Sequence, residues 1–189
     1  MTPTSLLDPS VATGLHPVLE APSARDDRAP QDWLVRHMQQ ADVPAVKAMF
    51  RALHIFNASL DPRFALSEAW ESHFDAAMRQ ALHSDTALCL IARATDTDQP
   101  CGFALAAVHR DSGMWHYHEW VEVEALYVED TCRGSGLAEA LLDRVCEWAD
   151  GIGQSVVQLY VTASNERAIH FYQHAGFRTT QEIMRKVLA

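Results

Sequence analysis

The sequence lacks two features that would have assigned it to large classes of protein. It contains no GxxxxGK[ST] loop, which argues against a P-loop nucleotide hydrolase. Its longest apolar runs, such as residues 87–92, are far too short to cross a bilayer, so we expect no membrane partner. The four cysteines form no CxxC pair, which predicts buried thiols in a reducing compartment and therefore a cytoplasmic protein.

Residues 1–31 are poor in the residue types that build a core. They contain no aromatic residue, no Lys or Arg before Arg25 and five of the eight prolines. This composition predicts a disordered or loosely packed extension without a secretory signal, followed by one domain over 32–189. The alternative is a short segment that lies over the core or over a partner subunit.

Positive charge is also scarce: the chain has 15 Lys and Arg but 25 Asp and Glu, which gives a formal net charge of −10. A field of this sign repels phosphate backbones, so nucleic acid is a poor partner. It attracts cations, so it favours a substrate such as an amine.

The most informative stretch runs from a predicted strand ending at Val128 into a glycine turn and a predicted helix over 136–150. The residues of the strand are β-branched, aromatic or large and apolar, and Arg133-Gly-Ser-Gly136 cannot continue it. A glycine turn before a helix can bind a phosphate through unpaired backbone N–H groups. The alternative is an ordinary turn, and with no third glycine in register a dinucleotide fold is only weakly indicated.

Hydrophobic periodicity and turn residues give the order β-α-α-β-β-β-α-β-α-β. We expect a loop over 54–64, a second helix over 66–82, a strand over 155–161, a helix over 165–175 and a strand-like remainder to Leu188. This order predicts a mixed α+β fold with a mostly antiparallel central sheet flanked by helices.

Two motifs resemble those of the GNAT superfamily of N-acetyltransferases. Arg133-x-x-Gly136-x-Ala138 is similar to its acyl-CoA pyrophosphate loop. Asn165-x-x-Ala-x-x-Phe-Tyr172-x-x-x-Gly-Phe matches every fixed position of its C-terminal motif. The resemblance covers about 32–189 and implies the same fold, with direct acetyl transfer from acetyl-CoA to an amine and no metal.

The resemblance also suggests catalytic groups. Glu124 is the expected base, since several family members carry a glutamate there, with Glu122 on the same strand face as the rival. A water chain or His118 are further alternatives. Tyr172 is expected as the acid that protonates the departing thiolate, although Phe171 and Tyr172 could simply be core aromatics.

The remaining expectations concern binding. The acceptor is expected to be a small cationic amine, with a protein amino group or a non-catalytic acyl-CoA-binding module as alternatives, and a homodimer is common in the family. The loop around Asp61 could hold the amine or merely cap itself. The resemblance assigns cofactor contacts to Leu126, Tyr127, Val128, Arg133, Gly134, Ser135, Gly136, Leu137, Ala138, Asn165 and Tyr172.

Overall fold

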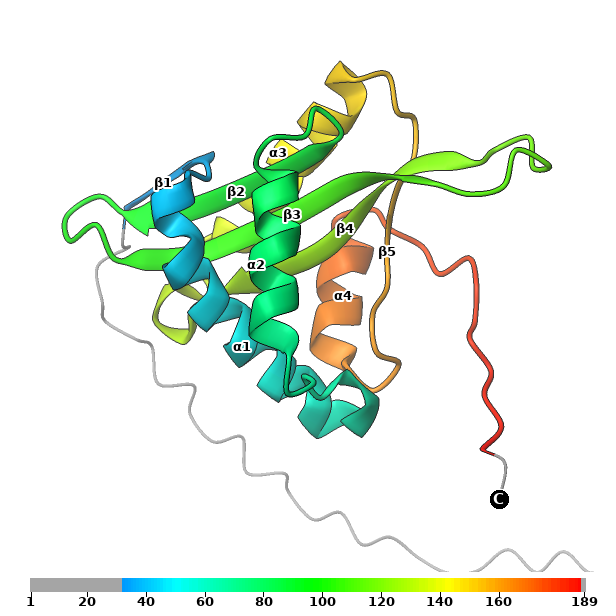
Figure 1. Ribbon diagram of the computed structural model, residues 1–189, viewed down its shortest axis with the longest axis horizontal. Coiled ribbons are helices and arrows are strands. Elements are labelled where there is room, and N and C mark those ends of the chain that lie inside the picture. The colour runs from blue at the N-terminus through cyan, green and yellow to red at the C-terminus, as the bar shows by residue number, and fades with distance from the viewer. Residues whose placement is uncertain (1–31, 188–189) are drawn as a thin grey trace, which may run out of the picture.

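The computed structural model describes residues 32–187, and its centre is a five-stranded sheet in the order β1-β2-β3-β4-β5 (Figure 1). The first four strands are antiparallel, and β5 is parallel to β4. The predicted N-terminal extension lies outside the described residues. The strands are β1 Trp33–His37, β2 Ala87–Ala94, β3 Pro100–Arg110, β4 Glu119–Val128 and β5 Val157–Leu159.

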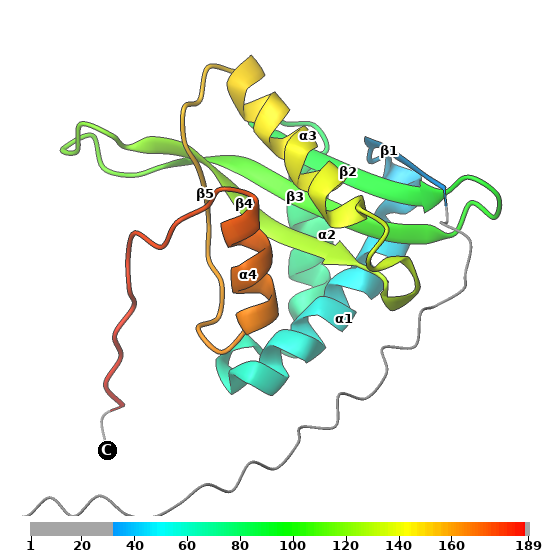
Figure 2. The same cartoon turned by 180° about the vertical axis from the view of Figure 1, so that it is seen from behind.

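Helices cover both faces of the sheet (Figures 1 and 2). On one face α1 Val43–Leu60 and α2 Trp70–Ala81 pack over a core that includes Ile91 and Phe103. On the other face α3 Leu137–Gly151 and α4 Glu166–His174 pack over a second core. The predicted mixed, mostly antiparallel fold is therefore confirmed.

A β-bulge in β4 changes which side chains face which layer. Leu105 pairs with Ala125 and Ala106 pairs with Val123, so Glu124 is the extra residue. Val121 and Val123 belong to the core beneath α3, whereas Ala125 belongs to the core beneath α1 and α2. The bulge therefore puts Glu124 and Ala125 in succession on the α1–α2 side, which a regular strand does not do.

Several predicted boundaries were wrong. The segment expected as a loop from His54 is helical to Leu60, and α1 ends only where Pro62 holds Asp61 in an extended conformation. Residues 66–69, expected in the second helix, precede it, because α2 begins at Trp70. Turn-forming residues such as Asn57 had favoured the loop, but α1 continues through them, and the Asn57 carbonyl accepts a hydrogen bond from Asp61 N–H in its last turn.

The C-terminal part also differs from the prediction. The strand expected over 155–161 is paired only at Val157–Leu159. No strand follows α4 in the described residues, which end at Val187. Strand-like composition is not enough to form a strand, because a strand also needs a partner edge for its hydrogen bonds.

Candidate active site

The turn before α3 presents a row of open main-chain donors. Gly134 and Gly136 have φ of +78° and +80°, a conformation that other residues adopt only with strain. Within the described residues, no hydrogen bond is donated by the backbone N–H groups of 134–138. These donors lie at the N-terminus of α3, where the helix dipole is positive. The turn therefore has the geometry of an anion-binding site.

Side chains hold this turn in place from outside. The Trp33 Nε1–H donates to Ser135 Oγ at 3.2 Å, and that hydroxyl donates to the Cys132 carbonyl at 2.7 Å. The Ser135 side chain is thus occupied, which leaves its backbone N–H for a ligand. Arg133 forms an ion pair with Asp130, so its positive charge is partly offset.

Among residues 32–187, no strand pairs with the edge of β4 beyond the bulge on the β5 side. Hydrogen-bonded pairing with β5 covers only 121–123, while β4 continues to Val128. Glu129 N–H donates to Cys101 in β3, so by alternation the main-chain groups of Leu126 and Val128 point to the open side. Those of Tyr127 face β3 instead, and Arg133 Nε–H already donates to the Val128 carbonyl at 3.2 Å. Leu126 is therefore the residue best placed to pair with an amide-bearing ligand.

The motif at α4 places Tyr172 against the second core. Its ring lies between those of Phe171 and Phe177, with centroids 5.0 and 5.7 Å away. Burial raises the pKa of Tyr172 to about 12, so the hydroxyl stays protonated at neutral pH and can act as a proton donor. Asn165 caps α4 by accepting a hydrogen bond from Ala168 N–H at 3.2 Å. The cap occupies the oxygen of the Asn165 amide and leaves its NH₂ group.

The two candidate bases differ in their surroundings. Burial raises the pKa of Glu124, the nearby charge of Glu122 raises it further, and His109 acts in the opposite direction. Glu122 instead accepts a hydrogen bond from Trp120 Nε1–H at 3.4 Å and lies 4.0 Å from His109 Nδ1. A raised pKa suits a base that must take a proton from an ammonium group. Glu124 is therefore the better candidate.

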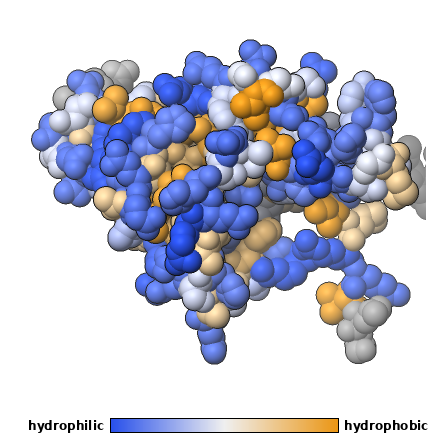
Figure 3. Space-filling model, turned by 45° about the horizontal axis from the view of Figure 1, so that its top comes forward, coloured by the Kyte–Doolittle hydropathy of each residue, from blue (hydrophilic) through white to orange (hydrophobic). Residues whose placement is uncertain are grey.

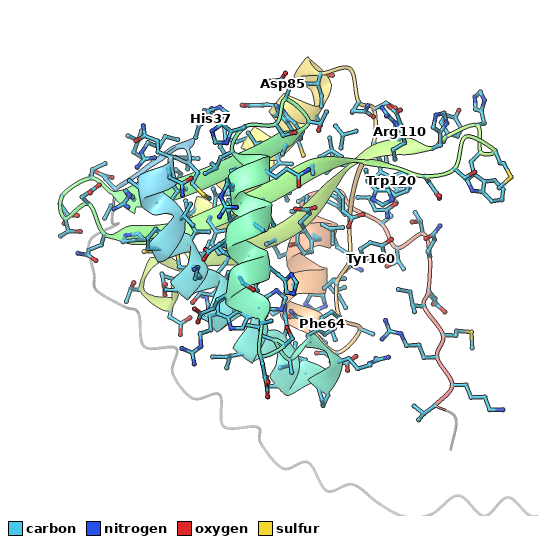
Figure 4. All side chains as sticks on the ribbon, in the orientation of Figure 1. His37, Phe64, Asp85, Arg110, Trp120 and Tyr160 are labelled. Atoms are coloured by element: carbon cyan, nitrogen blue, oxygen red, sulfur yellow. The ribbon has the colours of Figure 1, made fainter. Side chains whose placement is uncertain are left out.

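Glu124 lies on the wall of a cleft of about 720 Å³ formed by α1, α2 and the strands β2 to β4. Aromatic rings dominate one wall: Phe50 lies 4.9 Å from Phe74 and is nearly parallel to Trp70 at 6.1 Å. Phe64 lines the cleft from the turn between α1 and α2 (Figure 4). The rings of Phe50, Trp70 and Phe74 contact one another and also pack in or against the core beneath α1 and α2. No local signal in the sequence shows that they line a cleft as well.

Other expected residues are not in this cleft. Asp61 pairs with Arg63 and accepts a hydrogen bond from its backbone N–H, which supports the interpretation of Asp61 as a loop cap. His118 lies just beyond β3 and β4 in their connecting turn, and its Nδ1 is 3.0 Å from the Trp115 carbonyl oxygen.

Residues 32–187 contain neither a metal-binding cluster nor a membrane-spanning helix. No group of three or more His, Cys, Asp or Glu side chains there is arranged to hold a metal ion. None of the helices in this part of the chain is long and apolar enough to span a membrane.

Comparison with known proteins agrees with this architecture. The model of the acetyltransferase (GNAT) family matches residues 52–177. An uncharacterised N-acetyltransferase of Methanocaldococcus jannaschii is 29% identical over 85 residues, which are 45% of this chain and 37% of that protein. A D-amino-acid N-acetyltransferase of Saccharomyces cerevisiae is 29% identical over 92 residues, or 49% and 56% of the two chains. The chain thus spans between about a third and just over half of these relatives.

A solved structure shares the fold at low sequence identity. The structure of AAC(6')-Iy in complex with a CoA bisubstrate analogue has a TM-score of 0.64 and 19% identity, covering 84% of this chain and 99% of that one. The fold and the site define the class as a mixed α+β protein whose open main-chain turn lies beside a carboxylate-bearing cleft. Within that class, the chain belongs to the GNAT acetyltransferase family.

Proposed function

We propose that this protein transfers the acetyl group of acetyl-CoA directly to the amino group of an acceptor. One observation carries the proposal: the open anion site at 134–138 and the cleft containing Glu124 both adjoin the unpaired part of β4. A ligand with a diphosphate at one end and amides along its length can therefore pair with both the turn and the β4 edge. Its thioester end would then lie near Glu124.

The main chain supplies the cofactor contacts in this proposal. The N–H groups of Gly134, Ser135, Gly136, Leu137 and Ala138 bind the diphosphate, and Leu126 pairs with an amide of the pantetheine arm. The Asn165 amide NH₂ can donate to the same arm. Tyr127 contributes its ring to the core rather than its main chain to the ligand, because its backbone faces β3. Residues 32–189 form the acetyltransferase domain in this proposal.

Two side chains carry the proton transfers. Glu124 removes a proton from the ammonium group of the acceptor, directly or through water, since only the neutral amine is a nucleophile. Tyr172 donates a proton to the thiolate that leaves, because its hydroxyl remains protonated. The acidic net charge of −10 favours a small cationic acceptor. A cytoplasmic location and a homodimer remain predictions.

The test is thiol release from acetyl-CoA by the purified chain with a panel of amines. We expect amine-dependent release that is lost in Glu124→Gln. Binding of CoA without release for any amine or protein amino group would instead identify a non-catalytic acyl-CoA-binding module.

A further inference from the structure

We propose that the acceptor is an amphipathic amine, with a single positive charge on a ring-sized apolar body, bound in the cleft between α1, α2 and the sheet. The inference rests on the proposed acetyl transfer and adds the substrate class. It depends on the side chains that line the cleft and not on the net charge of the whole chain.

The walls of the cleft are largely apolar and aromatic. The rings and long apolar side chains come from α1, α2 and the turn between them, while the small side chain of Ala107 in β3 leaves room at the base. The face of the molecule that Figure 3 shows is mostly hydrophilic, with a few hydrophobic patches. Burying an apolar ligand body against such walls is favourable, whereas burying polar groups there without partners is costly. The apolar and aromatic side chains are Phe50, Phe64, Leu66, Trp70, Phe74 and Met78.

The residues that line the cleft carry little negative charge. Glu124 is the only carboxylate among the described residues that line the cleft, and the charge of Arg63, which also lines it, is offset by its ion pair with Asp61. His54 adds none at neutral pH, because burial lowers its pKa. One ammonium group can therefore pair with Glu124, but a second or third ammonium would be desolvated without a partner. This lining disfavours polyamines and aminoglycosides even though the whole chain is acidic.

The size and shape of the cleft suit a small ligand that carries a ring. Its volume of about 720 Å³ lies within the usual range for pockets that enclose a small organic ligand. The rings of Phe50 and Trp70 both line the cleft and are nearly parallel, with an interplanar angle of 17°, so together they form an aromatic surface. Flat apolar bodies stack on such surfaces, and a cation near the rings is also stabilised.

The first experiment compares amines on the full-length chain with acetyl-CoA by thiol release. Phenethylamine represents the proposed class, ethylamine lacks the apolar ring, and spermidine and neamine carry several charges. We expect kcat/KM for phenethylamine to exceed that for ethylamine by about 10- to 100-fold, the effect of burying a phenyl-sized group. A preference for spermidine or neamine would overturn the inference and leave acetyl transfer intact.

A matched pair of substitutions tests the role of lining charge. His73 and Ala76 are exposed on α2, but only His73 lines the cleft. His73→Glu adds a second carboxylate to the cleft and should raise the spermidine-to-phenethylamine ratio of kcat/KM about tenfold. Ala76→Glu adds a carboxylate outside it and should leave that ratio unchanged. An equal shift in both variants would show that overall charge selects the acceptor, contrary to the inference.

A second pair separates this inference from the proposed reaction, using binding rather than turnover. Ala77 lines the cleft and its neighbour Ala76 does not, and both are exposed. In calorimetry with CoA present, Ala77→Phe should weaken phenethylamine binding at least tenfold, while Ala76→Phe should not. This pattern without thiol release from any amine would refute acetyl transfer and keep the amphipathic ligand. No phenethylamine binding and no turnover would refute the inference.

Discussion

The two halves of the site are built from different parts of the chain. The cofactor half consists mainly of backbone groups from one continuous stretch, 126–138, with α4 beside it. The acceptor half consists of side chains from α1, α2 and three strands. Backbone groups can bind any acyl-CoA, since every sequence carries them, whereas side chains can select one acceptor. The comparison teaches that the cofactor can be inferred from motifs, while the acceptor must be inferred from the cleft.

The largest effect is expected from removing Glu124, the proposed base between the cofactor half and the acceptor half of the site. Glu124→Gln should lower kcat about 100-fold or more at neutral pH, because an amide cannot accept the proton of the ammonium group. Steady-state kinetics with the best acceptor measures this effect. Glu119→Gln is the control, since Glu119 pairs with Arg110 at the far end of β4. A kcat within twofold of the original would reject Glu124 as the base.

The next effect tests the proposed acid. Tyr172→Phe should lower kcat about 10- to 100-fold and leave KM for acetyl-CoA nearly unchanged, since the packed ring is retained and the acid is lost. Tyr160→Phe, at an exposed position after β5, is the control. Unchanged turnover on the preferred acceptor would make Tyr172 a core aromatic only.

A third substitution should affect the cofactor half alone. Valine at position 136 must adopt a φ near +80°, which is strained for a β-branched residue, although the space beside the glycine is open. Because such strain costs about 1–3 kcal/mol, Gly136→Val should raise KM for acetyl-CoA roughly tenfold or more. Gly113→Val, at an open position in the β3–β4 turn, is the control. Unchanged CoA affinity would remove the proposed anion site.

The smallest effect is a shift in the pH profile. Glu124 works only when deprotonated, so activity should rise with pH through its raised pKa. Glu122 contributes to that raised pKa, so Glu122→Gln should lower the pKa of Glu124 and move the acidic limb of kcat/KM to lower pH. The shift should be small, because burial is the larger cause and remains. A shift to higher pH would contradict this account.

The sequence predicted most of the cofactor half because its signals are local. Gly134 and Gly136 occupy the conformations for which glycine was expected, and α3 begins directly after them. Asn165 caps α4 at the expected position, and Glu122 and Glu124 share a strand face as the period of two predicted.

Other features could not be predicted, since they depend on distant partners. The bulge at Glu124 follows from the register of β3 against β4, and the end of pairing at Val123 follows from the short β5. The helical course of 54–60 continues α1 through residues whose local preference is for a loop, so those residues alone do not predict it.

The sequence alone thus identified the family and supplied the hypotheses of a main-chain anion site and a candidate acid and base, because each depends on residues close together in the chain. Only the tertiary structure decided which main-chain groups of β4 stay open and that Phe50, Trp70 and Phe74 line a cleft with one carboxylate. The reason is physical: backbone conformation is set mainly by local sequence, but a cleft exists only where separate elements pack and leave space between their side chains.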